Sequence, residues 1–181
     1  MPFNLNKLPA DEFMRLRASL PVADVRSPGE FAAGHIPRAV NIPLFDDEQR
    51  AEVGTKYKKE GSSAAVMLGI DLAAPGMSEK LRSGLDLTAG GRLLAYCWRG
   101  GMRSEAMAWL FSLGGIEPFV LSGGYKAYRN HILSDLGRER KYIILGGLTG
   151  SGKTGILKYM KSAGEQVTDL EGLASHRGSA F

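Results

Sequence analysis

The sequence has a single cysteine, Cys97, so one chain cannot form an internal disulfide bond. A lone thiol is typical of a reducing compartment, where it stays free to react. The sequence also lacks any run of about 20 apolar residues that would span a membrane. Its N-terminus lacks the basic-then-apolar order of a secretion signal. These absences predict a soluble, cytoplasmic protein.

No strong charge imbalance marks the chain either. Its 23 lysines and arginines exceed its 19 aspartates and glutamates, which gives a net charge of +4 and a pI near 9.2. This excess permits an anionic partner such as RNA but does not require one. Of the 181 residues, 44% are hydrophobic, which is enough for one domain of ordinary size with some residues left over.

Cys97 lies where a short apolar run ends and a glycine-rich loop begins. The run, residues 93–96, is bounded by glycines and predicts a buried strand. Over residues 104–113 the apolar side chains recur at helical spacing. A cysteine between a strand and a helix would lie among backbone N–H groups at the positive end of the helix dipole. That position favours a thiolate and an anion beside it.

This loop, residues 97–103, is the predicted catalytic site. Cys97 is the candidate nucleophile, and Arg103 is the candidate side chain for stabilising an anion. The residues between them are predicted to cradle the anion through their backbone N–H groups: Trp98, Arg99, Gly100, Gly101 and Met102. A free cysteine is more often a small buried hydrophobe. We favour a reactive thiol because glycines and arginines beside a core strand have no evident packing purpose.

Short apolar runs alternate with helical patterns over the first 137 residues. Strands are predicted at 22–25, 93–96 and 118–121, with a short one within 35–44. Helices are predicted at 11–20, 46–60, 62–72, 78–87, 104–113 and 122–136. This alternation predicts an α/β fold in which helices cover both faces of a mainly parallel sheet. The reactive group of such a sheet lies at the carboxyl end of a strand, which is where Cys97 falls.

A second glycine-rich loop follows an apolar run at 142–145, predicted to be a strand. Residues 147–154 match the phosphate-binding pattern G-x-x-x-x-G-K-[ST] without a mismatch, and a predicted helix follows to about residue 162. The glycines let backbone N–H groups face phosphates, the lysine reaches the terminal phosphate, and the threonine hydroxyl is placed for Mg²⁺. The predicted phosphate-binding residues are Gly147, Gly150, Ser151, Gly152, Lys153 and Thr154. No protein-held metal site is predicted.

Residues 138–181 are predicted to form only the beginning of a P-loop domain. They supply one strand, one helix and a second apolar run at 167–170, also predicted to be a strand. A domain of this type normally needs more than about 100 residues. The predicted organisation is therefore one domain over residues 1–137, followed by an incomplete P-loop domain over residues 138–181.

Four ordered segments resemble the rhodanese family over roughly residues 9–135. They are residues 24–31, 34–43, the loop that begins at Cys97, and residues 121–125. In that family the cysteine takes a sulfur or selenium atom from a donor, as a persulfide or perselenide, and passes it to an acceptor. The resemblance implies this role for Cys97 and a rhodanese-like parallel sheet flanked by helices.

The spacing within the loop departs from that family. Five residues separate Cys97 from Arg103, one more than in the common single-domain rhodanese loop. This is the spacing of the related Cdc25-type phosphatases, whose wider loop wraps a phosphate while the arginine stabilises phosphoryl transfer. The loop holds no carboxylate for general acid catalysis, and Glu105 lies beyond it. Group transfer is therefore favoured over phosphatase action, with a tetrahedral anion of the selenophosphate or phosphate kind in the loop.

A rhodanese segment followed by a P-loop resembles the tRNA 2-selenouridine synthase family, and so do residues 169–179. The resemblance covers essentially the whole chain. It implies replacement of sulfur by selenium in 2-thiouridine at the wobble position of tRNA, with selenophosphate as the donor. It also implies an intermediate geranylation from geranyl diphosphate, which makes a diphosphate a candidate ligand of the P-loop. Candidate residues for tRNA backbone contact are Lys56, Lys58, Lys59, Arg138, Arg140 and Arg177.

Two other functions stay open at this point. One is a thiosulfate sulfurtransferase that acts through a Cys97 persulfide and makes no use of the P-loop. The other is a non-catalytic rhodanese module whose loop only senses anions. Dependence of tRNA modification on Cys97 separates both from the selenouridine synthase.

Overall fold

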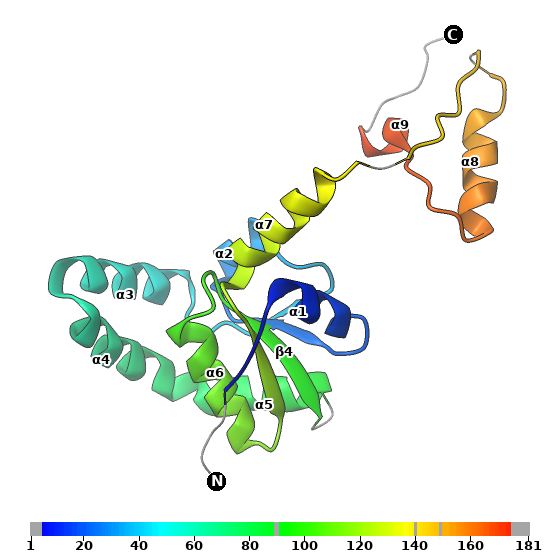
Figure 1. Ribbon diagram of the computed structural model, residues 1–181. Helices are drawn as coiled ribbons and strands as arrows, with labels where there is room; N and C mark the ends of the chain where they lie inside the picture. Colours follow the sequence, from blue (N-terminus) through cyan, green and yellow to red (C-terminus); the bar gives the residue numbers. More distant parts are fainter. Residues whose placement is uncertain (1–4, 89–90, 140, 149, 175–181) are drawn as a thin grey trace. The chain divides into compact units, whose positions relative to one another are not determined.

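The structure is a computed structural model that describes residues 5–88, 91–139, 141–148 and 150–174. The chain divides into two compact units, an N-terminal unit, Met1–Arg138, and a C-terminal unit, Glu139–Phe181 (Figure 1). Among the described residues, no helix has the length and apolar character needed to cross a membrane.

The N-terminal unit is built on a five-stranded sheet with the order β1-β5-β4-β2-β3, in which every pair of neighbours is parallel. Its strands are β1 (Asn6–Leu8), β2 (Val22–Asp24), β3 (Val40–Asn41), β4 (Arg92–Tyr96) and β5 (Glu117–Leu121). The predicted parallel α/β fold is confirmed. Sequence patterns missed β1, because a three-residue edge strand with one buried side chain, Leu8, carries no periodic signal.

Helices cover both faces of this sheet (Figure 1). They are α1 (Ala10–Leu16), α2 (Pro28–Ala32), α3 (Asp47–Glu60), α4 (Ser62–Ala73), α5 (Met77–Thr88), α6 (Met102–Leu113) and α7 (Gly124–Leu136), with a 3₁₀ turn at Ala74–Gly76. Side chains of α5 and α6 pack with Leu93 and Cys97 in one core. Side chains of α1 and α7 pack with Leu94 and Tyr96 in the other. Successive strand residues thus face opposite cores, as the strand period of two requires.

Local sequence signals mark the starts of α2 and α3. Ser27 and Glu30 form a capping box at α2, and Asp46 and Gln49 form one at α3, so the first amides of both helices are satisfied. Helix α1 ends at Leu16, four residues before the predicted end. Residues 17–20 form turns instead, because Pro21 disfavours a helical conformation in the residue before it and the chain must reach β2 at Val22.

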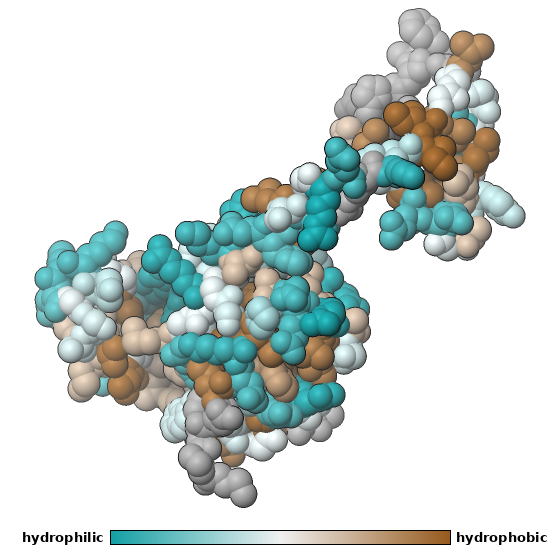
Figure 2. Space-filling model, viewed as in Figure 1, coloured by the Kyte–Doolittle hydropathy of each residue, from teal (hydrophilic) through white to brown (hydrophobic). Residues whose placement is uncertain are grey.

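The C-terminal unit contains α8 (Lys153–Ser162) and α9 (Leu170–Leu173) among its described residues. The predicted strands at 142–145 and 167–170 are wrong: neither is a strand, and Leu170 begins α9, which Asp169 caps. A strand needs hydrogen-bonded neighbours, and the described part of this unit offers none. Ile143 and Ile144 are consequently 99% and 90% exposed, and hydrophobic residues gather on the visible surface of this unit (Figure 2).

Candidate functional site

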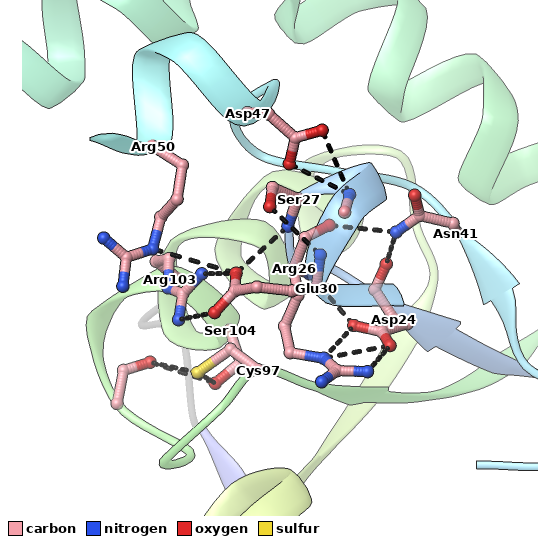
Figure 3. Close-up of polar contacts among 12 residues, drawn as sticks. Asp24, Arg26, Ser27, Glu30, Asn41, Asp47, Arg50, Cys97, Arg103 and Ser104 are labelled. Atoms are coloured by element: carbon pink, nitrogen blue, oxygen red, sulfur yellow. Dashed lines mark hydrogen bonds and ion pairs between the residues drawn. The ribbon is translucent and has the colours of Figure 1, made fainter. Parts of the chain in front are cut away.

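Cys97 is the first residue after β4, the middle strand of the sheet, and lies at its carboxyl end as expected. The residue is only 3% exposed. Its Sγ lies 3.2 Å from the hydroxyl of Ser104 and 3.9 Å from the carbonyl oxygen of Gly101 (Figure 3). Helix α6 begins at Met102 without a side-chain cap, so its first amides are free to meet an anion.

Ser104 is a polar partner of the thiol that sequence reasoning missed. Its side chain is fully buried, and its hydroxyl donates to the carbonyl oxygen of Gly101 at 2.9 Å. While that bond is made, the Cys97 thiol is the donor in its contact with Ser104. A thiolate only accepts, so on ionisation the hydroxyl would turn its proton from Gly101 to the sulfur. The sequence signal that could have identified Ser104 was its position directly after Arg103, in the first turn of the predicted helix.

The loop after Cys97 is fastened to the first turn of α7. The N–H of Tyr125 donates to the carbonyl oxygen of Cys97 at 2.8 Å, and the N–H of Lys126 donates to that of Trp98 at 3.1 Å. Gly100 and Gly124 both have positive φ and face each other so closely that a Cβ on either would strike backbone atoms of the other segment. The expectation that these glycines have no packing purpose is therefore wrong for Gly100.

Arg103, the predicted anion-stabilising residue, is ion-paired with Glu30 (Figure 3). Its Nη1 lies 2.6 Å from Glu30 Oε2, and its Nη2 lies 3.4 Å from Oε1. Arg50 of α3 approaches the same carboxylate at 3.7 Å. Three helices thus bring two arginines to one carboxylate beside the loop. Sequence reasoning missed Glu30 and Arg50, because no local pattern indicates that α2 and α3 meet α6 there.

The carboxylate of Glu30 carries a charge under ordinary conditions. Burial would raise its pKa, but the hydrogen bond and charge of Arg103 outweigh burial, helped by the N–H of Ser27 and the charge of Arg50. The pKa of Glu30 is therefore below its usual value. An anion that enters the loop must share Arg103 with Glu30 or displace it, and Arg50 supplies a second positive charge at the same place. The buried Nε of Arg50 has no hydrogen-bond partner in the described part of the chain.

A buried ion pair lies next to the aromatic side chains beside the loop. Arg26 and Asp24 are both fully buried, with Arg26 Nη2 2.6 Å from Asp24 Oδ2 and 2.7 Å from the carbonyl oxygen of Gly34. The guanidinium lies 4.1 Å from the centre of the Tyr125 ring and 5.9 Å from that of Trp98. Arg26 Nε and Nη2 donate to Asp24 and Gly34 within the core, and the guanidinium stabilises the aromatic side chains next to the loop.

The predicted helix follows the phosphate-binding motif, whereas residues 142–145 before it do not form the predicted strand. Gly147, Gly150 and Gly152 have positive φ, and α8 begins directly after Gly152. A Cβ added at Gly150 or Gly152 would meet nothing within 4 Å, so these two glycines are not enclosed by the described residues around them. Lys153 Nζ donates to the carbonyl oxygens of Gly147 at 2.9 Å and Leu148 at 2.7 Å. Thr149 lies outside the described residues.

The remaining predicted site residues belong either to the P-loop segment or to the candidate tRNA contacts. Ser151 lies in the P-loop, and Thr154 lies in the first turn of α8, where its hydroxyl suits a phosphate-bound Mg²⁺. The described residues contain no group of three or more His, Cys, Asp or Glu side chains that would hold a metal by themselves. Of the candidate tRNA contacts, Lys56 and Arg138 form ion pairs with Glu60 and Asp135, Lys58 and Lys59 are exposed, and Arg140 and Arg177 lie outside the described residues.

Two family profiles match the chain. The rhodanese-like domain matches residues 9–131, and the tRNA 2-selenouridine synthase AAA domain matches residues 140–181. A protein from Sulfurovum sp. named tRNA 2-selenouridine synthase is 47% identical over 167 residues, which cover 89% of this chain and 44% of that protein. A protein of the same name from Nitrosomonas europaea is 42% identical over 170 residues, which cover 91% and 44%. The chain spans less than half the length of these relatives.

A solved structure with a similar fold is the N-terminal domain of a putative ATP/GTP binding protein from Clostridium difficile 630. It is 34% identical, has a TM-score of 0.65, and the match covers 72% of this chain and 99% of that one. The rhodanese-like profile extends from α1 into α7, including the loop that begins at Cys97, and takes in more than half of the chain. The chain therefore belongs to the rhodanese-like domain family.

Proposed function

We propose that the chain is the N-terminal part of a tRNA 2-selenouridine synthase, with a rhodanese-like domain over residues 1–137 and the start of a P-loop domain over residues 138–181. The observation that carries this proposal is that relatives of that name align with both units at once, over 89% to 98% of the chain. A tRNA substrate also supports a cytoplasmic location.

The proposed reaction has two balanced steps. The sulfur of 2-thiouridine first attacks the geranyl carbon of geranyl diphosphate, which forms a C–S bond, breaks a C–O bond and releases diphosphate and a proton. Selenophosphate then supplies selenium to C2 of the base, where a C–Se bond replaces the C–S bond. Water takes the phosphoryl group. The second step yields 2-selenouridine, geranylthiol and phosphate, and neither step changes the oxidation state of selenium.

The Cys97 loop is proposed to serve the selenophosphate step. Cys97 acts as the nucleophile at phosphorus: an S–P bond forms as the P–Se bond breaks, selenide leaves with the electron pair to attack C2 of the base, and water then hydrolyses the phosphocysteine. Ser104 is the hydrogen-bond partner of the thiol at 3.2 Å. The amides from Trp98 to Met102 and the guanidinium of Arg103 hold the tetrahedral anion. The second arginine, Arg50, offsets the charge that Glu30 adds beside Arg103. This pair of arginines supports a doubly charged phosphate-type donor over a neutral one.

The P-loop is proposed to bind the diphosphate of geranyl diphosphate. Backbone N–H groups of the loop would bind phosphate oxygens, and Lys153 would leave the carbonyl oxygens of Gly147 and Leu148 for the phosphate. Mg²⁺, held by Thr154 and the ligand, would offset part of the phosphate charge. Titration with geranyl diphosphate tests this: Lys153→Ala is expected to bind at least about tenfold more weakly. Equal binding by wild type and variant would reject the assignment.

A sulfurtransferase is the second candidate. In that reaction the Cys97 thiolate attacks the outer sulfur of thiosulfate, a persulfide forms, and sulfite leaves with the electron pair of the broken S–S bond. The observation that favours it is the complete packing of the Cys97 loop within the N-terminal unit, which does not depend on the P-loop. The anion-sensing module is the non-catalytic form of the same alternative.

Mass spectrometry of tRNA nucleosides distinguishes these functions. The 181-residue chain is incubated with 2-thiouridine tRNA, geranyl diphosphate and selenophosphate, with Cys97→Ser in parallel. We expect 2-selenouridine with the wild type and at least about a thousandfold less with Cys97→Ser, as for loss of a nucleophile. Sulfite release from thiosulfate without any 2-selenouridine would favour the sulfurtransferase. Loss of both activities in the wild type would favour the module.

A further inference from the structure

An open groove of about 360 Å³ lies directly beside the reactive loop. We call it the α7 groove. Two of its residues, Trp98 and Arg99, follow Cys97 in the chain, and the others belong to α7. Its lining residues are Trp98, Arg99, Lys126, Arg129, Asn130 and Leu133. None of the residues that the sequence predicted as tRNA contacts lines it.

Backbone hydrogen bonds fix the position of the α7 groove relative to the start of the Cys97 loop. Tyr125 and Lys126 donate to the carbonyl oxygens of Cys97 and Trp98, respectively. The indole of Trp98 also contacts the Tyr125 ring, with centroids 5.8 Å apart, and that ring packs on the buried guanidinium of Arg26. A ligand held in this groove therefore has a defined position relative to the backbone of the Cys97 loop.

The lining of the α7 groove combines an aromatic surface with positive charge. Arg99, Lys126 and Arg129 are exposed, Trp98 is half-buried, and the six lining residues include no carboxylate. Cations along a groove bind a phosphate backbone, and an accessible indole stacks on an unpaired base. The amide of Asn130 can donate to and accept from a base edge. A duplex hides its base faces, so this combination suits unpaired nucleotides.

We propose that the α7 groove binds an unpaired RNA nucleotide adjacent to the one that is modified at Cys97. Its base stacks on Trp98, and the flanking phosphates contact Arg99, Lys126 and Arg129. This proposal rests on the proposed function, because it takes RNA as the substrate. In this proposal α7 contacts the RNA substrate. The selenium donor lies near Arg103, Glu30 and Arg50, which belong to other helices.

RNA binding without selenophosphate tests the groove independently of the selenium chemistry. The probe is a fluorescent anticodon stem-loop RNA that carries 2-thiouridine, titrated with the full chain at several salt concentrations and followed by anisotropy. Trp98→Ala is expected to weaken binding by about 5- to 100-fold. Lys126→Ala and Arg129→Ala should each weaken binding and lower the slope of log K against log salt by about 0.7 for one lost phosphate contact.

Arg82→Ala is the matched control. Arg82 is an exposed arginine on α5, which packs on the opposite face of the sheet from α7, and its removal should change neither the affinity nor the salt slope. A duplex RNA of the same length should bind at least about tenfold more weakly than the stem-loop, since it offers no base to Trp98. If Trp98→Ala unfolds, the two variants of exposed α7 residues still test the groove.

Three results would overturn the proposal: no binding by the wild type, unchanged binding by the α7 variants, or equal binding of the duplex and the stem-loop. Groove-dependent RNA binding without formation of 2-selenouridine would support the groove and contradict the proposed function. Formation of 2-selenouridine at the wild-type rate in Lys126→Ala and Arg129→Ala, with unchanged KM for tRNA, would support the proposed function and overturn the groove.

Discussion

The two glycine-rich loops of this protein are similar in sequence but differ in how closely the surrounding residues pack against them. Each follows an apolar segment and leads into a helix, α6 or α8. The Cys97 loop is enclosed: Cys97 is 3% exposed, and Gly100 has no room for a Cβ. The P-loop is less enclosed, because a Cβ added at Gly150 would meet nothing within 4 Å. The conformation of the Cys97 loop is therefore set by packing against the rest of its unit. The conformation of the P-loop is set mainly by its own residues.

We therefore expect a substitution in the N-terminal unit to lower the stability of that whole unit. A substitution in the C-terminal unit should affect only the residues near it. Both tryptophans, Trp98 and Trp109, belong to the N-terminal unit. Tryptophan fluorescence during urea denaturation therefore reports the unfolding of that unit alone. A pair of substitutions, one in each unit, measures how far each change reaches.

The largest effect is expected from Asp24→Ala. This change leaves the guanidinium of Arg26, whose side chain is 1% exposed, without its ion-pair partner. We expect the free energy of unfolding of the N-terminal unit to fall by about 3–5 kcal/mol, because the buried charge is no longer compensated. The matched change, Asp169→Ala, removes the cap of α9 and should cost about 1 kcal/mol locally. It should leave the fluorescence transition in place. A loss below about 1 kcal/mol for Asp24→Ala would contradict the argument.

A smaller effect is expected from Gly124→Ala. The new Cβ would strike the carbonyl oxygen of Cys97 at a backbone φ of 60°, so the loop or α7 must move. We expect a loss of about 2–3 kcal/mol in the free energy of unfolding. Gly115→Ala is the control, because Gly115 lies in the same unit, has a φ of 81°, and a Cβ added there would meet nothing within 4 Å. The same loss from both changes would show that strain, and not enclosure, sets the cost.

The smallest effect is expected from Glu30→Gln, and it depends on pH. The pKa of Glu30 is lowered in the folded protein, mainly by Arg103 acting against burial. A lowered pKa stabilises the fold above the unfolded value of about 4.3, and this contribution is lost as pH falls through the folded value. At pH 7 the variant should be less stable by no more than about 1 kcal/mol.

Urea midpoints from pH 7 down to pH 3 provide the measurement. The stability difference between wild type and Glu30→Gln should shrink as the pH falls below about 4.3, because protonated Glu30 no longer pairs with Arg103. A difference that stays constant over this range would mean that Glu30 acts through packing. Arg50→Gln, which removes the more distant partner at 3.7 Å, should show a weaker form of the same dependence.

Much of the fold was predictable because its signals are local. Apolar runs and helical spacing indicated β2, β4, β5 and the long helices. The position of Cys97 directly after a strand placed it at the carboxyl end of the parallel strands. The helix predicted after the phosphate-binding motif is also present, as α8. These features depend on a few neighbouring residues, so they can be recognised in the sequence alone.

The contacts that define the site depend on residues far apart in the chain. Arg103 and Glu30 are separated by 73 positions, and no pattern in either segment names the other as its partner. The same holds for Gly100 against Gly124. The wrong strand prediction at 142–145 has the reverse cause: its residues favour a strand, but in the described part of its unit no neighbour pairs with it.

The sequence by itself therefore determined the α/β pattern, the place of Cys97 after a strand and the glycine-rich motif of residues 147–154, since each is encoded by adjacent residues. Only the tertiary structure decided that Arg103 is paired with Glu30, that Ser104 reaches the thiol, and that α7 forms a basic and aromatic groove beside Cys97. The physical reason is that charges and packed surfaces act through space, and the folding of the chain alone determines which of them meet.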